Sequence, residues 1–221
     1  MQLSAVILAR VFAFIEPVDL NPRGRAHYPE LVSAVVERYG FMKYPQVAQD
    51  FDETKGVQFE MGRDGEVTIS SIQIYTQGIV VDTASSTDDS DRVLHEALLW
   101  LKAKFGMNYS PEMISRRAYV SQLTFYSEVG LGRLNVALSR LAERVSNRLP
   151  QFFGREIVYE PIGVYLGYDA TQVKQAPANF SIERRTETPF SENKYFSAAP
   201  LPTSGHIAAL EAFEADLTAS G

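Results

Sequence analysis

The chain has 221 residues, of which 45% are apolar and 22% charged, and this ordinary globular composition excludes a disordered or fibrous protein. It contains no cysteine, which excludes disulfides, thiolate catalysis and cysteine-ligated metal sites. The formal net charge of −6 argues against a general binder of duplex DNA, since such a protein needs a positive face.

The beginning of the chain does not have the pattern of a signal peptide. It lacks a basic leading segment, and Arg10 interrupts the apolar run that precedes it. No uninterrupted apolar stretch reaches the roughly 18 residues that a membrane-spanning helix needs. We therefore expect a cytoplasmic protein that does not contact a membrane.

The first half of the chain is expected to hold four strands and two helices. Apolar and β-branched runs predict the strands at residues 6–16, 57–61, 67–75 and 79–83. Asp64-Gly65 is a hairpin signal between the second and third of these strands. Apolar residues at helical spacing predict one helix over 29–39 and another that opens within 85–91 and ends at Gly106.

The second half repeats this order. Strands are expected at residues 118–128, 156–167, 180–185 and 194–198. A helix is expected from about Leu131 to Leu149, with its leucines on one buried face, and Thr203 is expected to cap the last helix.

Residues 1–110 and 111–221 thus each read β-α-β-β-β-α, and we predict an α+β fold in which they are similar halves of one compact unit. A pseudo-two-fold repeat of this kind would form a shared antiparallel sheet with its helices on one face. The element order resembles the TATA-binding-protein-like arrangement, in which a duplicated unit forms a saddle. No motif of that family is present, so the resemblance implies no site residue and no DNA-binding role.

The Ser and Asp residues at 85–91 form the densest acidic cluster. Asp91 and His95 are four apart on the expected helix, a spacing that can hold a metal ion. Capping of the helix N-terminus explains the same residues better, because hydroxyls and carboxylates bind its free N–H groups. We predict no metal site and no cofactor, and we assign no catalytic residue, since none of the three histidines lies in a known motif.

Both predicted β-α turns end in Gly-Arg, at Gly24-Arg25 and Gly132-Arg133. Backbone N–H groups at such a turn can hold an anion, so Arg25, Gly132 and Arg133 are candidate anion-binding residues. The alternative is that glycine is needed there only for a tight turn.

The predicted helix over 131–149 carries a row of arginines beside its leucine face. These are Arg133, Arg140, Arg144 and Arg148. They are candidate partner-binding residues, because guanidinium groups form bidentate pairs with the carboxylates of an acidic surface. Two alternatives remain open: arginines that only cover the edge of the core, or a site for single-stranded nucleic acid.

No set of residues points to a reaction, so the sequence favours a non-enzymatic protein. We expect an interaction subunit or adaptor in a cytoplasmic assembly, bound to another protein chain or to a second copy of itself. The first alternative is a nucleic-acid-binding module that uses a saddle-like sheet and the arginine-lined helix. The second is an enzyme with unrecognised Asp, Glu or His chemistry.

Overall fold

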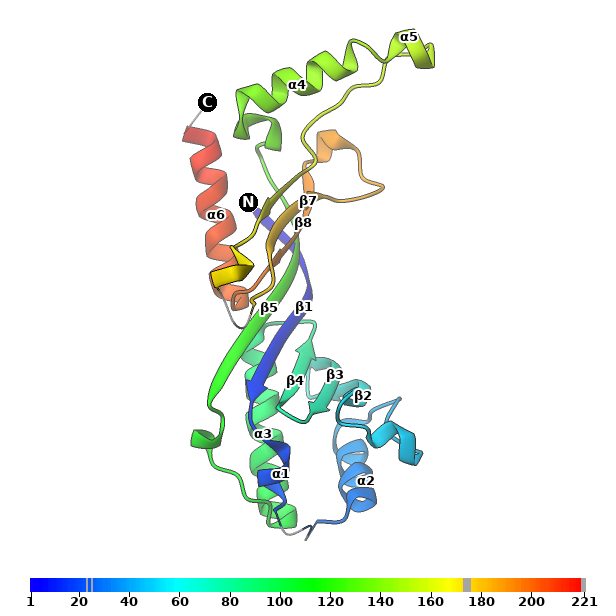
Figure 1. Cartoon of the computed structure of the whole chain (residues 1–221), viewed down its shortest axis with the longest axis vertical. Helices are drawn as coiled ribbons and strands as arrows, with labels where there is room; N and C mark the ends of the chain where they lie inside the picture. Colours follow the sequence, from blue (N-terminus) through cyan, green and yellow to red (C-terminus); the bar gives the residue numbers. More distant parts are fainter. Residues whose placement is uncertain (23, 25, 173–175, 220–221) are drawn as a thin grey trace. The chain divides into compact units, whose positions relative to one another are not determined.

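The computed structural model describes residues 1–22, 24, 26–172 and 176–219 (Figure 1). These residues form an α+β fold with eight strands. The strands are β1 (Gln2–Phe14), β2 (Val57–Asp64), β3 (Val67–Tyr75), β4 (Gly78–Thr83), β5 (Arg116–Tyr126), β6 (Gly163–Leu166), β7 (Phe180–Arg184) and β8 (Lys194–Ala199). They form one antiparallel sheet in the order β2-β3-β4-β1-β5-β8-β7-β6. The α+β class and the antiparallel sheet are as predicted.

The helices fall close to their predicted positions, with additions. They are α1 (Pro17–Leu20), α2 (Tyr28–Tyr39), α3 (Thr87–Phe105), α4 (Val136–Ser146), α5 (Pro150–Phe153) and α6 (Thr203–Ala219). The short helices α1 and α5 were not predicted, and both begin at a proline, whose fixed φ suits the first position of a helix. Among the helices of the described chain, none is both long enough and apolar enough to cross a bilayer.

The chain divides into two compact units. Val6–Ser121 and Pro200–Ser204 form one, here called the N-terminal unit. Met1–Ala5, Gln122–Ala199 and Gly205–Gly221 form the other, the C-terminal unit. The relation between 1–110 and 111–221 as repeated halves stays a prediction.

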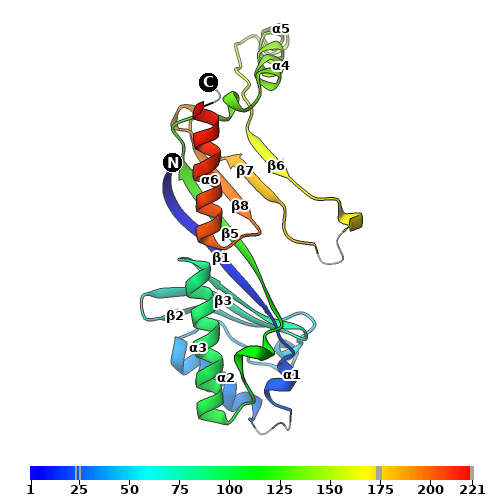
Figure 2. The same cartoon turned by 90° about the vertical axis from the view of Figure 1, so that its left-hand side faces the viewer.

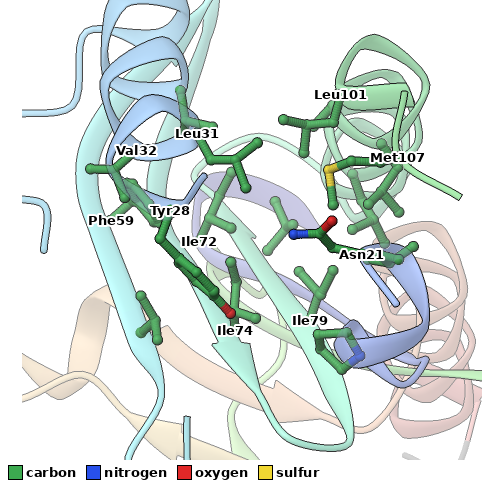
Figure 3. Close-up of a pocket in the computed structure, with 18 of the residues that line it drawn as sticks. Asn21, Tyr28, Leu31, Val32, Phe59, Ile72, Ile74, Ile79, Leu101 and Met107 are labelled. Atoms are coloured by element: carbon green, nitrogen blue, oxygen red, sulfur yellow. The ribbon is translucent and has the colours of Figure 1, made fainter. Parts of the chain in front are cut away.

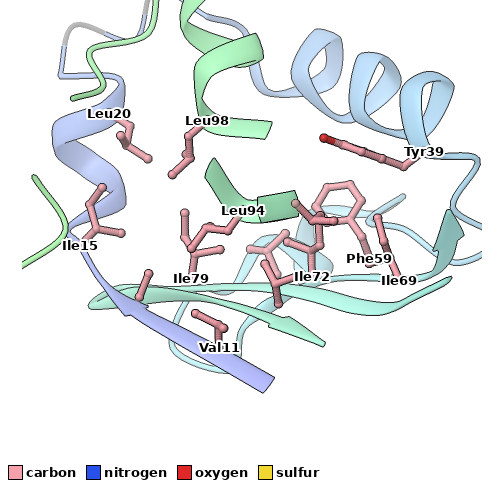
Figure 4. Close-up of a cluster of buried hydrophobic side chains, with 14 of the residues drawn as sticks. Val11, Ile15, Leu20, Tyr39, Phe59, Ile69, Ile72, Ile79, Leu94 and Leu98 are labelled. Atoms are coloured by element: carbon pink, nitrogen blue, oxygen red, sulfur yellow. The ribbon is translucent and has the colours of Figure 1, made fainter. Parts of the chain in front are cut away.

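The core of the N-terminal unit lies between α2, α3 and one face of the strands. Figure 4 shows Leu94 and Leu98 of α3 above Ile72 of β3 and Ile79 of β4, and all four side chains are buried. The strands present these residues because alternate side chains of a strand point to the same face. The predicted Asp64-Gly65 hairpin is confirmed, since Asp64 pairs with Val67 in the β2–β3 register.

The opposite face of the same strands carries a polar network. Arg10 on β1 lies directly across from Asp82 on β4. Its Nε and Nη2 donate to the two oxygens of that carboxylate at 2.7 Å each, and Ser71 Oγ donates to Oδ2 at 3.0 Å. The arginine that interrupts the apolar run of the sequence is therefore half of a bidentate pair, which lets Asp82 be buried.

The N-termini of α3 and α6 are joined by reciprocal hydrogen bonds. Ser86 caps α3 as predicted, accepting from Asp89 N at 3.0 Å. Thr87 N donates to Thr203 Oγ1 at 3.0 Å, and Thr203 N donates to Thr87 Oγ1 at 2.9 Å. Both threonines are buried in the N-terminal unit, so each hydroxyl satisfies an amide that the helix itself leaves free.

In the C-terminal unit, α6 covers one face of β5 and β8 (Figure 2). Its core includes Leu123, Ile182 and Leu210. His206 of α6 is completely buried there, with its ring Nε2 2.8 Å from Ser197 Oγ. Burial lowers its pKa from 6.5 to about 4, because the charged imidazolium is poorly solvated in a core.

Two predicted elements differ from the structure. The helix expected over 131–149 is shorter, and α4 has no buried residue, so the prediction that its leucine face joins the core is wrong. The strand expected over 156–167 is reduced to the four residues of β6. Asn135 explains the later start of α4, because its Oδ1 accepts from Ala137 N at 2.8 Å and from Leu138 N at 3.3 Å.

Candidate interaction surface

Residues 131–168 of the C-terminal unit, here called the arm, expose a large apolar surface. Figures 1 and 2 show α4 and α5 lying away from the strands of this unit. The exposed apolar side chains are Leu134, Val136, Leu138, Leu141, Phe152, Phe153, Val158, Tyr159, Ile162, Tyr165, Leu166 and Tyr168, which are 37% to 78% exposed. Large apolar groups gathered on one exposed helix face mark an interaction site, and Leu138 and Leu141 are such a pair on α4.

The arm is ordered by its own hydrogen bonds. Ser139 Oγ donates to Gly132 O at 2.6 Å, which ties the start of α4 to the turn before it. Ser146 Oγ accepts from Tyr159 N at 2.8 Å, which holds the segment after α5 against the end of α4. Gly154 ends α5 at a φ of 66°, a left-handed conformation that favours glycine. The apolar face is therefore displayed on a defined helix.

All four arginines of the predicted row are exposed, at Arg133, Arg140, Arg144 and Arg148. Arg140 and Arg144 lie on α4, about 100° and about 60° around the helix from Leu141, whereas Arg148 follows the end of α4 at Ser146. Within the described part of the chain, no carboxylate lies within ion-pair distance of any of the four. Residues 131–155 hold five arginines and one glutamate, so a positive edge borders the apolar face.

The Gly130–Arg133 turn uses part of its backbone internally. Leu131 N donates to Tyr195 Oη at 3.3 Å, and Arg133 N donates to Gly130 O at 3.2 Å. The amides of Leu131 and Arg133 are therefore already used in hydrogen bonds within the chain, and these are two of the amides that would bind an anion. Gly132 lies between them in sequence. Arg25, the counterpart of Arg133 in the first turn, lies outside the described residues. Anion binding by this pair of turns remains a prediction.

Strand β6 is the last strand of the sheet order and pairs with β7 on one side. It is only four residues long, and Tyr165 is 67% exposed. The backbone groups of an edge strand can pair with a strand of another chain. The arm thus ends in a second feature suited to a protein partner.

The residues weighed for metal binding are engaged elsewhere. Asp91 Oδ1 accepts from Arg117 Nε at 2.7 Å, and His95 Nδ1 lies 3.0 Å from Tyr109 Oη. No group of three His, Asp or Glu side chains among the described residues is arranged to hold a metal ion.

Sequence reasoning identified the arginines but missed the exposure of the leucines beside them. The helical pattern locates an apolar face without telling whether it meets the chain's own sheet or another molecule. Phe152 and Phe153 lie between the helix predicted to end at Leu149 and the strand predicted to begin at residue 156, and they are the signal that could have indicated a surface. Comparison with models of known protein families finds no match, and no curated protein compared with the chain is significantly similar to it.

Proposed function

We propose that this protein is a non-enzymatic interaction subunit of a cytoplasmic assembly, and that it binds another protein chain through the arm. The observation that carries the proposal is the exposed apolar face of α4 on a segment whose arginines form no ion pair with a described carboxylate. The absence of cysteine from the sequence fits a reducing compartment.

The two parts of the surface define the chemistry of the partner. Leu138, Leu141 and the phenylalanines of α5 are best covered by an apolar groove, because their burial removes apolar area from water. Arg140 and Arg144 then lie at the rim of that groove. Carboxylates there would form partly desolvated, bidentate pairs with the guanidinium groups. The partner surface is therefore apolar at its centre and acidic at its edge.

An anionic membrane surface is the other class of partner that this chemistry would fit. Basic amphipathic helices bind such surfaces by placing their apolar face among the acyl chains and their cations near the lipid headgroups. The edge strand β6 favours a protein instead. Its backbone can be extended by a strand from another chain, whereas lipid offers no ordered partner for those N–H and C=O groups. The helix and the strand together fit a folded protein partner.

We also propose that the two halves of the chain are related by a pseudo-two-fold axis, as in the TATA-binding-protein-like arrangement. The sheet order supports this, because β2-β3-β4-β1 from one end corresponds to β6-β7-β8-β5 from the other. The reciprocal bonds between Thr87 and Thr203 support it too. A two-fold axis that exchanges the two threonines would convert the bond from Thr87 N to Thr203 Oγ1 into the bond from Thr203 N to Thr87 Oγ1. Each threonine is the first residue of the last helix of its half.

The arm is tested by reversing charge in the arginine row. Arg140→Glu with Arg144→Glu should lower recovery of the stoichiometric partner at least about tenfold, because two bidentate pairs become repulsive contacts. A photo-crosslinking residue at Leu141 in the full chain identifies that partner and the contacted segment by mass spectrometry. The melting temperature should stay unchanged, because both arginines are exposed.

The matched control is Arg63→Glu with Arg185→Glu, which makes the same change of charge at exposed positions outside the arm. It should recover the partner as the parent chain does. Equal recovery by the arm variant would refute the proposal. So would crosslinking to nucleic acid in place of protein, or arginine-dependent binding to vesicles with 30% phosphatidylserine (a composition on the order of an anionic leaflet).

A further inference from the structure

The N-terminal unit contains a cavity of about 130 Å³. It lies between α2 and α3 above the strands, and Figure 3 shows Leu31 of α2 facing Leu101 of α3 across it, with Ile74 and Ile79 on the sheet side. Well-packed cores have few voids larger than a water molecule. An engineered apolar cavity of about 150 Å³ stays dry and binds benzene. The space here is therefore of the size and character that hold a small apolar molecule.

One polar atom inside this core has no partner. Tyr39 lines the cavity and is 3% exposed. Its hydroxyl has no partner in good hydrogen-bond geometry among the described residues, and the polar group beside it is the Arg38 guanidinium. In Figure 4 the hydroxyl is directed from the side of α2 toward α3. The Arg38 guanidinium lies over the face of the Tyr39 ring, 5.2 Å from the centroid. A buried hydroxyl without a hydrogen-bond partner destabilises the folded protein, because it has lost its bonds to water. A ligand with a hydrogen-bond acceptor next to this hydroxyl would remove that destabilisation.

The mouth of the cavity restricts the charge of what enters. Tyr28 Oη donates to Glu53 Oε1 at 2.8 Å, and both residues line the cavity. The Glu53 carboxylate repels an anion at this rim, and the lining residues that the structure describes include no cationic side chain. Burial raises the pKa of Tyr39, partly offset by Arg38, so its hydroxyl keeps its proton and acts as a donor. A neutral ligand is favoured.

We infer that this cavity is a binding site for a small, neutral, mainly apolar molecule with one hydrogen-bond acceptor, which accepts from the Tyr39 hydroxyl. The inference is independent of the proposed function, because the arm belongs to the C-terminal unit and the cavity to the N-terminal unit.

Two probes of similar shape separate the apolar contribution from the hydrogen bond. Acetophenone carries a carbonyl acceptor, and ethylbenzene does not. Calorimetric titration of the full chain should show binding of both, with acetophenone about tenfold tighter, as one buried hydrogen bond allows. In Tyr39→Phe, acetophenone should weaken about tenfold, to the level of ethylbenzene, while ethylbenzene is unaffected. Methyl NMR shifts of Ile74 and Ile79 on titration locate the probe.

Tyr109→Phe is the matched control, because Tyr109 is also a buried tyrosine of this unit but its hydroxyl already contacts His95. It should leave the preference for acetophenone intact. Ala97→Phe places a ring in the cavity and should abolish binding of both probes, with circular dichroism to verify the fold. If Ala97→Phe does not fold, the Tyr39→Phe result decides. Absence of binding by either probe at millimolar concentration, or an unchanged preference in Tyr39→Phe, would overturn the inference.

Discussion

Several buried polar side chains of the described residues are satisfied by residues of another helix or strand. Ser90 Oγ of α3 donates to Ala9 O of β1 at 2.8 Å. Ser197 Oγ bonds to Ser181 O and to His206 Nε2. The first and the last of these bonds fix a helix to a strand, and the bond to Ser181 O joins β8 to β7; a shift in register would leave a polar atom unpaired in the core. Tyr39 departs from this pattern, because its buried hydroxyl has no partner in good hydrogen-bond geometry among the described residues.

The buried His206 should make stability depend on pH. Its pKa is lowered from 6.5 to about 4 in the folded protein. Between these values the unfolded chain binds a proton that the folded chain does not, so stability is complete above pH 6.5 and falls as the pH drops toward 4. At pH 4.5 the loss due to this residue should be about 2 kcal/mol.

Urea unfolding at pH 7 and pH 4.5 measures this loss. His206→Gln retains a group that can bond to Ser197 but does not titrate, so its free energy of unfolding should fall about 2 kcal/mol less than that of the parent chain. If both proteins lose the same stability between the two pH values, His206 does not titrate as the structure indicates.

The amphipathic helices α3 and α4 differ in what their apolar faces meet. Leu98 of α3 is 3% exposed and belongs to the core, whereas Leu138 of α4 is 45% exposed. Leu98→Ala should lower the free energy of unfolding by about 2–5 kcal/mol through lost burial and a residual cavity. Leu138→Ala should cost less than about 1 kcal/mol in the isolated chain, since nearly half of the residue is already exposed to water.

Urea unfolding of the two variants checks this difference in the absence of a partner. The Leu138 variant should instead be weakened in partner recovery. A large loss of stability in Leu138→Ala would mean that α4 packs against the chain's own core in solution, which would also remove the basis of the proposed function.

Most elements were predictable because their signals are local. The α3 boundaries follow from the Ser86 cap and from Gly106, which ends the helix at a φ of 67°. The β2–β3 hairpin follows from Asp64-Gly65. The missed features depend on tertiary contacts: no local signal shows that α4 has no sheet to cover, or that the Tyr39 hydroxyl lacks a partner. Of the candidate site, the arginine row was predicted and the exposed apolar face beside it was not.

At the scale of the whole molecule, the sequence halves and the compact units do not coincide. Residues 111–121 follow the first half in sequence but belong to the N-terminal unit, as do residues 200–204. Residues 1–5 belong to the C-terminal unit. Such an exchange of segments couples the folding of the two halves, since a cut at residue 110 removes a part of each unit.

The contacts of residues 111–121 indicate how large this coupling is. Ile114 is buried in the core of the N-terminal unit. Ser115 N donates to Phe14 O at 2.9 Å, and Arg117 Nε pairs with Asp91 at 2.7 Å. A fragment of residues 1–110 loses all three contacts and leaves β1 without β5 beside it. A fragment of residues 1–121 keeps them.

The fragment 1–110 should therefore unfold at a lower urea concentration than 1–121, with a free energy of unfolding at least about 3 kcal/mol lower. Adding the fragment 111–221 to 1–110 should raise its midpoint, because it restores the missing strand and the Thr203 contact to Thr87. Urea titrations followed by the fluorescence of the single tryptophan, Trp100, measure each case. Equal midpoints for 1–110 and 1–121, with no effect of the added fragment, would mean that each half folds as an independent domain. The exchanged segments would then contribute little to the stability of either core.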